Sequence, residues 1–176
     1  ATTRELYRNQ TGQEPPDNHD DRSWMRWRRQ QLTGLLRELR RTLPPPTVIS
    51  LSPGPFRSAY NLWLQDWELW AVGSLIDDLV VQNYAYSLAG FARDLNQPAL
   101  VKAKGWGMPV EIGILAGFGG RTPAMAFVSD KVRLSFERGY GVIYFYWEGL
   151  WGMYAGPEGG PARRAAFAQL HGGPGS

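Results

Sequence analysis

The sequence contains no cysteine and only two histidines, His19 and His171, and these absences exclude several kinds of site. Without cysteine the chain forms no disulfide bond, no thiolate zinc site and no cysteine nucleophile. Both histidines fall in segments that we predict to be tails, so neither a Ser-His-Asp triad nor a histidine-based metal site is expected. The sequence also lacks a Walker loop, a G-x-G-x-x-G turn and an H-E-x-x-H motif. We therefore expect no metal and no cofactor.

Long apolar runs are missing too. The longest uncharged stretch, residues 79–92, is interrupted by Gln82, Asn83 and Ser87, and it is too short and too polar to span a bilayer. No secretory signal is visible at the start of the sequence. These features predict an intracellular protein, cytoplasmic or nuclear, with no transmembrane segment.

Lysine is scarce: there are three lysines against sixteen arginines, with a net charge of +3. Arginine binds phosphate in a forked geometry and stacks on aromatic rings. A composition rich in arginine and tryptophan and free of cysteine suits a small viral or phage regulatory protein. A bias toward Arg, Gly, Pro and Ala also follows from a GC-rich genome, so composition leaves both explanations open.

The length of 176 residues and the 43% apolar content predict a single domain with tails. Residues 1–19 are polar, contain a Pro pair and show no periodicity, which predicts a disordered arm. Residues 20–155 form the predicted domain. Residues 156–176 are rich in Gly and Pro and form a predicted tail, in which residues 161–170 can make one short helix that orders on a partner.

Residues 60–95 are the densest apolar stretch and hold three of the eight tryptophans. Apolar residues recur there at steps of three and four, which predicts two central helices separated near Gly73. Ser74 followed by Asp77 has the spacing of a capping box that opens the second helix. Polar and apolar residues alternate in part over residues 47–51, and several of them are β-branched, which predicts a short edge strand.

From residue 99 onward apolar residues recur at every second position, where before they recurred at helical spacing. Candidate strands are residues 100–102, 110–116, 124–128, 132–137, 141–147 and 150–154. The short turns between them favour antiparallel neighbours. The sequence thus predicts an α+β fold, in which an N-terminal basic amphipathic helix and two central Trp-rich helices pack on a C-terminal antiparallel sheet of four to five strands.

The basic amphipathic helix is predicted from Asp21 or Ser23 to Leu43. Its apolar stripe contains the tryptophans and leucines, and its charge is almost wholly arginine. The helix could be a surface helix with solvated arginines, a phosphate-binding helix or a membrane-surface helix. The candidate nucleic-acid contacts are Arg26, Arg28, Arg29, Arg40 and Arg41, supported by Lys102, Lys104 and Trp106 of a later Gly-flanked loop.

Two further groups of residues are candidates for contacts with a partner. Leu32, Leu35, Leu39 and Leu43 have the spacing of a helix–helix seam, and Tyr144 and Tyr146 share one face of a predicted strand. The tyrosines could form a base-stacking platform or pair with neighbouring strands inside a two-sided core.

These features support two functions of different classes and a third that is weaker. The preferred one is a non-enzymatic regulatory protein that binds nucleic acid through the arginine helix. The alternative is a protein-interaction module that forms homo-oligomers or engages a partner protein through apolar and aromatic faces. The third is an enzyme that uses Asp77, Asp78, Glu111 or Glu148 with a divalent ion. The simpler explanation of Asp77 and Asp78 is that they lie in the first turn of a helix, where the helix dipole favours negative charge.

Overall fold

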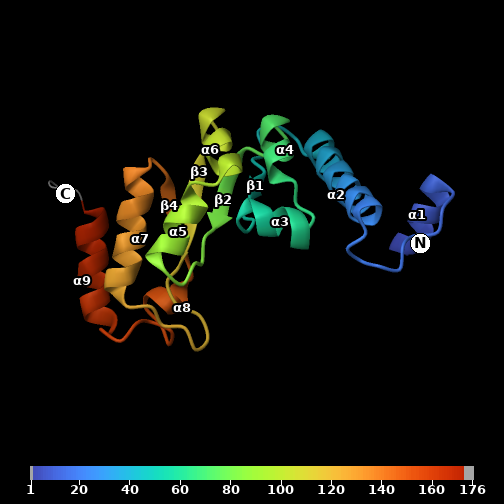
Figure 1. Ribbon diagram of the computed structural model, residues 1–176. Coiled ribbons are helices and arrows are strands. Elements are labelled where there is room, and N and C mark those ends of the chain that lie inside the picture. The colour runs from blue at the N-terminus through green and yellow to red at the C-terminus, as the bar shows by residue number, and fades with distance from the viewer. Residues whose placement is uncertain (1, 173–176) are drawn as a thin grey trace.

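The computed structural model describes residues 2–172 and shows an alternating α/β fold (Figure 1). The strands are β1 (Ser50–Leu51), β2 (Asp78–Gln82), β3 (Val110–Leu115) and β4 (Gly141–Phe145). The helices in the described part of the chain are α1 (Thr3–Thr11), α2 (Arg22–Thr42), α3 (Phe56–Leu62), α4 (Trp67–Val72), α5 (Leu88–Leu95), α6 (Pro98–Gly105), α7 (Met125–Glu137), α8 (Trp147–Leu150) and α9 (Gly160–His171).

The sheet has four strands in the order β1-β2-β3-β4, and every pair is parallel. Each strand is joined to the next by one or two helices. Such crossovers are right-handed in nearly all proteins, so strands that lie in chain order carry their connecting helices on the same face of the sheet. This is the arrangement of a (β/α) barrel, and the four strands are consistent with part of one.

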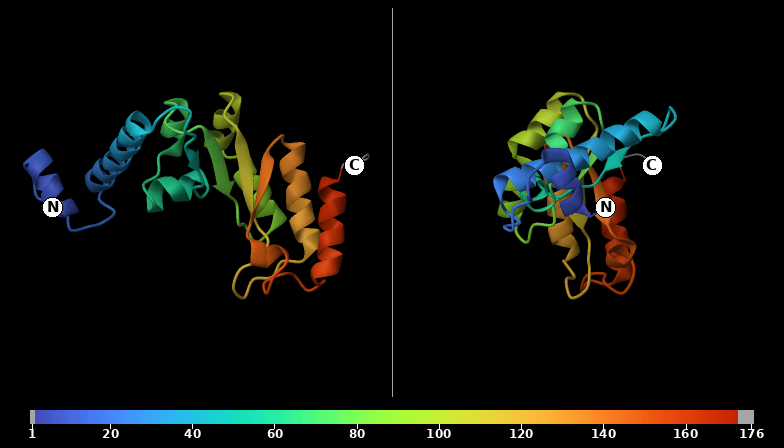
Figure 2. Two further views of the ribbon diagram at one scale, coloured as in Figure 1. Left: turned by 180° about the vertical axis from the view of Figure 1, so that it is seen from behind. Right: turned by 90° about the vertical axis from the view of Figure 1, so that its right-hand side faces the viewer.

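The two faces of the sheet differ in burial. Leu79, Val81, Ile112 and Ile114 are at most 1% exposed and form one core with the helices. On β4 the opposite face is open, where Ile143 and Phe145 are 46% and 40% exposed. The helical layer on the first face includes α7, which packs against β3 and β4, and α9, which packs against α7 (Figure 2).

The predicted antiparallel α+β fold is wrong. Residues 124–128 and 132–137, predicted as two strands, form the single helix α7, and residues 100–102 lie in α6. In α7 the buried side chains include Val128, Lys131, Val132 and Ser135, which is a helical spacing. The alternation of Val132, Leu134 and Phe136 resembled a strand only because the buried lysine and serine were counted as outward-facing.

The second central helix is also partly wrong. Residues 78–82 form β2, and only residues 88–95 are helical. A short, fully buried strand reads as a continuous apolar run, which periodicity cannot distinguish from a buried helix. Ser74 does not cap a helix but has a positive φ of 52°. Asp77 accepts hydrogen bonds from the backbone N–H of Ile49 at 2.7 Å and from Arg40 at 2.8 Å, and so ties α2 and the segment before β1 to the segment before β2.

Several predicted elements are confirmed. The basic helix is α2, and its start is fixed by Asp21, whose carboxylate accepts from the backbone N–H groups of Ser23 and Trp24. The predicted strands at 110–116 and 141–147 are β3 and β4, and the edge strand predicted at 47–51 is β1. The short helix predicted at 161–170 is α9.

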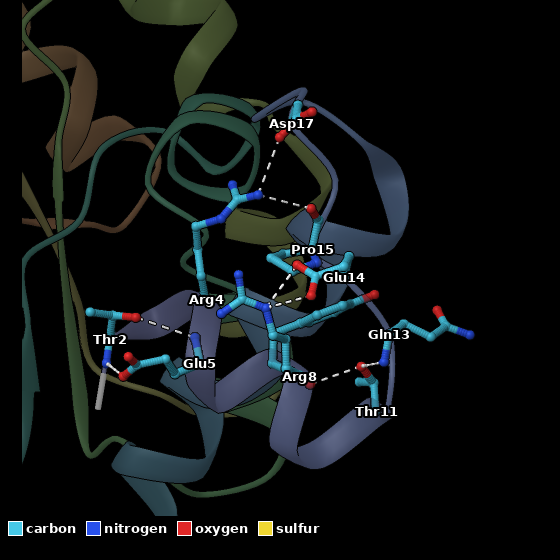
Figure 3. Close-up of polar contacts among 10 residues, drawn as sticks. Thr2, Arg4, Glu5, Arg8, Thr11, Gln13, Glu14, Pro15 and Asp17 are labelled. Atoms are coloured by element: carbon cyan, nitrogen blue, oxygen red, sulfur yellow. Dashed lines mark hydrogen bonds and ion pairs between the residues drawn. The ribbon is translucent and has the colours of Figure 1, made fainter.

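Regular structure begins earlier than predicted, because α1 lies within residues 1–19. A capping box between Thr2 and Glu5 opens α1, and Arg4 and Arg8 bind the segment that follows it (Figure 3). Tyr7 packs edge-on against Trp24 and Trp27, with ring centroids 5.1 and 5.2 Å away. The division into arm, domain and tail stays a prediction, and residues 173–176 of the predicted tail lie outside the described residues.

Candidate functional site

The carboxyl ends of β2, β3 and β4 bring aromatic residues together. Tyr84 follows β2, Phe118 follows β3, and Phe145, Tyr146 and Tyr154 come from the end of β4 and the segment after it. We call these five residues the aromatic cluster. The ring centroids of Phe145 lie 4.8 Å from Tyr146, 5.7 Å from Tyr84 and 6.0 Å from Phe118, and those of Phe118 and Tyr154 are 6.4 Å apart. The cluster therefore bridges three neighbouring strands.

The aromatic cluster is accessible. Phe118 is 54% exposed, Phe145 is 40% exposed, and Trp147 beside them is 67% exposed. The tyrosines add hydroxyl groups to this apolar surface, and burial raises the pKa of Tyr84, so its hydroxyl stays protonated at neutral pH. The surface can thus stack on a flat apolar face and hydrogen bond at its rim.

Glu148 lies next to the aromatic cluster, in the first turn of α8 and three residues after β4 ends. Its backbone carbonyl accepts a hydrogen bond from the N–H of Tyr154 at 2.9 Å. A side chain at Gly152 would come within 2.8 Å of the Cα atom of Glu148, so the returning chain passes directly over this residue. Glu148 is therefore held by backbone contacts while its side chain stays partly exposed.

The position of Glu148 depends on a backbone contact between two glycines. A Cβ atom at Gly149 would overlap the backbone nitrogen and oxygen of Gly117, and one at Gly117 would lie 2.9 Å from the Cα atom of Gly149. The loop after β3 and helix α8 can approach this closely only because neither residue has a side chain. Glu148 is thereby fixed beside the loop that carries Phe118.

Arg163 of α9 holds the segment that follows β3 at the same edge of the sheet. It is fully buried and donates to the carbonyls of Ala116 at 2.7 Å and Pro123 at 3.1 Å, and it also binds the carboxylate of Glu158. The buried charge is thus paired, as buried charges in proteins generally are. Positive charge in the first turn of a helix is unfavourable to the helix dipole, and Glu158 offsets the charge of Arg163.

The other candidate carboxylates lie at the opposite end of the sheet. Asp78 is the first residue of β2 and accepts from Ser50, and Glu111 is the second residue of β3. Burial, and secondarily the charge of Asp78, raises the pKa of Glu111. Asp77 precedes β2 and is bound by Ile49 and Arg40. Of the four predicted carboxylates, the structure therefore brings only Glu148 to the carboxyl edge.

Four arginines of α2 make contacts within the protein. The guanidinium of Arg29 lies 3.6 Å from the ring centroid of Tyr60, and Arg28 donates to the carbonyl of His19. Arg26 and Arg29 line a hollow of about 460 Å³ between α2 and the α3–α4 segment. Further along α2, Arg40 binds Asp77, and Arg41 binds Glu38 within the helix.

The other predicted contact residues are dispersed. Lys102 pairs with Glu68 at 2.5 Å, Lys104 donates to the carbonyl of Arg138, and Trp106 is 47% exposed. Leu32 packs against the core, whereas Leu35, Leu39 and Leu43 are exposed. Tyr144 packs on Phe167 of α9 on the helical face, while Tyr146 belongs to the aromatic cluster. Tyr144 and Tyr146 therefore do not share one surface.

Sequence analysis missed most of the aromatic cluster, including Tyr84, Phe118 and Phe145. The available signal was the alternation of short apolar runs with helices, because in a parallel sheet the residues that follow each strand meet at one edge. Across residues 2–172, no group of three or more His, Asp or Glu side chains is placed to hold a metal ion. None of the helices in this range is long and apolar enough to cross a membrane.

Comparison with known proteins gives one match. The model of a family described as glycosyl hydrolase-like 10 matches residues 1–134, which is more than half of the chain. These residues run from the start of the chain to the last turns of α7, so β4 and Glu148 lie beyond them. No curated protein and no solved structure matches the chain.

This match overturns the functions expected from the sequence. The non-enzymatic nucleic-acid-binding regulator and the protein-interaction module were both wrong, and so was the expectation that the protein is not an enzyme, because the family points to a glycosyl hydrolase-like enzyme. The predicted homo-oligomer stays a prediction. Because the family model matches more than half of the chain, this chain belongs to the glycosyl hydrolase-like 10 family, and its four-stranded parallel sheet is consistent with such a domain.

Proposed function

We propose that the carboxyl edge of the sheet binds a saccharide on the aromatic cluster, and that Glu148 supplies one of the carboxyl groups that cleave a glycosidic bond. The observation that carries this proposal is the placement of Glu148 beside exposed aromatic rings, at the end of the sheet where enzymes with (β/α) barrels hold their catalytic residues. The family supports the same class of reaction.

The aromatic cluster has the chemistry that a sugar ring requires. One face of a pyranose presents C–H groups, which pack on the electron-rich face of an aromatic ring. The hydroxyls at the sugar rim need hydrogen-bond partners, and the hydroxyls of Tyr84, Tyr146 and Tyr154 lie in the cluster. A mixed surface of this kind orients a saccharide while it removes water from the bond to be broken.

Cleavage needs a proton for the leaving oxygen and a group on the other side of the sugar. In the usual mechanism one carboxyl group protonates the glycosidic oxygen, the bond from the anomeric carbon to that oxygen breaks, and water supplies the hydroxyl of the new reducing end. A second carboxylate attacks the anomeric carbon or activates the water. Glu148 can take either of these roles.

Glu148 and Glu158 both follow β4, and they differ in whether an ion pair holds the carboxylate. Glu158 is bound by Arg163 and by the backbone N–H of Met125, whereas Glu148 has no ion pair among residues 2–172. A second carboxyl group, or the 2-acetamido group of a substrate, would complete the reaction with Glu148.

The test is hydrolysis by Glu148→Gln. The purified chain is incubated with a panel of aryl glycosides and with soluble polysaccharides, and released aryl alcohol and reducing ends are measured. Glu148→Gln should lose at least a hundredfold in rate, since general acid or base catalysis contributes roughly 10² to 10⁴. Its affinity for the saccharide should be retained, because the aromatic cluster is intact.

The control is Glu137→Gln, an exposed glutamate at the end of α7 that lies outside the loops of this edge. It should be as active as the wild type. Azide added to Glu148→Ala then identifies the side of the sugar on which Glu148 acts: a glycosyl azide of the substrate's configuration marks the acid/base of a retaining enzyme, and one of inverted configuration marks the group on the opposite face, a nucleophile or the base of an inverting enzyme. Full hydrolysis by Glu148→Gln would refute the assignment.

A further inference from the structure

A second hollow, of about 320 Å³, adjoins the aromatic cluster between the loops after β2 and β3 and the N-terminal half of α7. We call it the cationic pocket. Its lining includes Tyr86, Arg121, Thr122, Pro123, Phe127 and Lys131. It shares the loop after β3 with the aromatic cluster, because Phe118 and Arg121 pair through their backbones at 2.8 and 2.9 Å. The pocket therefore shares a loop with the surface on which the saccharide is proposed to bind.

Lys131 is the unusual residue of the pocket. It is 2% exposed, and its ammonium group lies 4.4 Å from the ring centroid of Phe127. A lysine ammonium has three N–H donors. Only one of them has a partner among the described residues, the carbonyl of Ala85 at 2.7 Å. A buried cation of this kind is costly unless it is paired.

Arg121 adds a second positive charge. Its guanidinium lies 3.4 Å from the ring centroid of Tyr86, and one of its nitrogens is 3.4 Å from the carbonyl of Tyr84. The pKa of Lys131 is lowered mainly by burial, and the nearby charge of Arg121 lowers it further. Two cations that repel each other thus share one pocket.

Among residues 2–172, no acidic side chain is paired with these two charges. The lining of the pocket contains no Asp or Glu, and neither Arg121 nor Lys131 forms an ion pair within residues 2–172. Arg163, the other buried cation of this region, is paired with Glu158. The contrast shows that the fold neutralises a structural cation here but leaves the cationic pocket without an anion.

We propose that the cationic pocket binds the carboxylate of an acidic sugar, a hexuronate unit of the saccharide that lies on the aromatic cluster. This inference rests on the proposed function for its saccharide. The carboxylate would accept from the ammonium of Lys131 and the guanidinium of Arg121, and the sugar ring would lie against Tyr86 and Phe127.

The size and the walls of the pocket favour a sugar over a bare anion. Small-molecule pockets are roughly 300 to 1,000 Å³, so 320 Å³ holds about one ring and not a chain. Two aromatic side chains and Pro123 supply apolar walls, which a sulfate or phosphate ion does not need. The hydroxyl of Thr122 adds a donor or acceptor for a sugar hydroxyl.

The test compares matched ligands with the full chain. Binding of the methyl glycosides of glucuronic, galacturonic and mannuronic acid is measured by calorimetry beside the three corresponding neutral hexosides. At least one uronide should bind ten times more tightly than its neutral partner. Lys131→Met and Arg121→Gln should each remove this preference and leave the weaker binding of the hexoside unchanged.

The matched control is Lys104→Met. Lys104 also donates to a backbone carbonyl and lies over an aromatic ring, Tyr140 at 4.9 Å, but it does not line the pocket. It should keep the uronide preference.

Equal binding of every uronide and its hexoside, or an unchanged preference in both pocket variants, would overturn the proposal. Inorganic sulfate that binds as tightly as the best uronide would overturn the sugar assignment. Glu148→Gln separates the two proposals: it should keep the preference for the uronide even though it no longer hydrolyses substrate, and hydrolysis of neutral glycosides with no uronide preference would refute only the pocket.

Discussion

The unpaired charge of Lys131 should make the stability of the protein depend on alkaline pH. The perturbation is Lys131→Met, which replaces the ammonium by an uncharged side chain of similar length. Burial first, and the charge of Arg121 second, lower the pKa of Lys131 from 10.5 to about 8. In the unfolded chain the same group would keep its proton up to about pH 10.5.

The magnitude follows from the size of this shift. The fall from 10.5 to about 8 corresponds to about 3 kcal/mol, at 1.36 kcal/mol per pKa unit. Water in the open pocket screens the charge, so we expect roughly 1 to 2 kcal/mol. The unfolded state binds more protons than the folded state between about pH 8 and 10.5, so stability rises with pH in that window. The free-energy cost of burying the charged ammonium is fully present below about pH 8 and absent above pH 10.5.

The assay is urea denaturation of the wild type and of Lys131→Met at several pH values between neutral and 10.5. Other titrating groups act equally on both proteins, so the difference in the free energy of unfolding reports on Lys131. This difference should move in favour of the wild type by roughly 1 to 2 kcal/mol as the pH rises. A difference that stays constant would refute the reasoning that Lys131 is a buried, uncompensated cation.

Three further substitutions test the framework of the site. Gly149→Ala should lower the free energy of unfolding by roughly 1 to 3 kcal/mol, measured in urea, because its methyl group overlaps the loop after β3. Arg163→Met should cost about 3 kcal/mol in the same assay, since it removes the ion-pair partner of the Glu158 carboxylate and the donor to two buried carbonyls. Asp77→Asn should make the free energy of unfolding less sensitive to acid. The N–H of Ile49 first, and Arg40 second, hold the pKa of Asp77 below 3.8. The carboxylate of Asp77 therefore stabilises the folded protein above pH 3.8, and this stabilisation is lost at lower pH.

Two of the three substitutions have a matched control. Gly34→Ala should stabilise α2 by about 0.5 to 1 kcal/mol, because Gly34 lies inside a helix with open space around it. Arg164→Met, at the exposed neighbour of Arg163, should change stability by less than about 0.5 kcal/mol. A Gly149→Ala variant as stable as the wild type would contradict the close backbone contact. An Asp77→Asn variant that loses stability in acid as the wild type does would contradict its role.

Local sequence patterns were enough to predict those helices and strands whose ends are marked by turn residues or prolines. Helix α2 was predicted because an amphipathic stripe starts at Asp21 or Ser23 and ends before three prolines, and the structure shows that Asp21 caps it. Strands β3 and β4 were predicted because the apolar pattern has a period of two there and glycine-containing turns follow each run. The candidate carboxylates included Glu148, and the partner-contact residues included Tyr146, but no local pattern set these two apart from the rest.

The direction of the strands could not be read in the same way. The short turns after residue 99 favoured antiparallel pairing only as long as residues 124–137 were taken as two strands. That stretch is the helix α7, so β3 and β4 are joined by a crossover long enough for parallel pairing, which is the pairing they show. One misassigned element therefore changed the fold class.

What the sequence determined by itself is the set of local elements with clear caps, the absence of cysteine chemistry, and the surplus of arginine. Only the tertiary structure decided which side chains meet. Tyr84, Phe118 and Tyr146 are far apart in the chain and converge because parallel strands end at one edge. Lys131 became a candidate ligand because its pocket closes between two loops and α7, and burial and pairing are properties of the packed chain that no local pattern records.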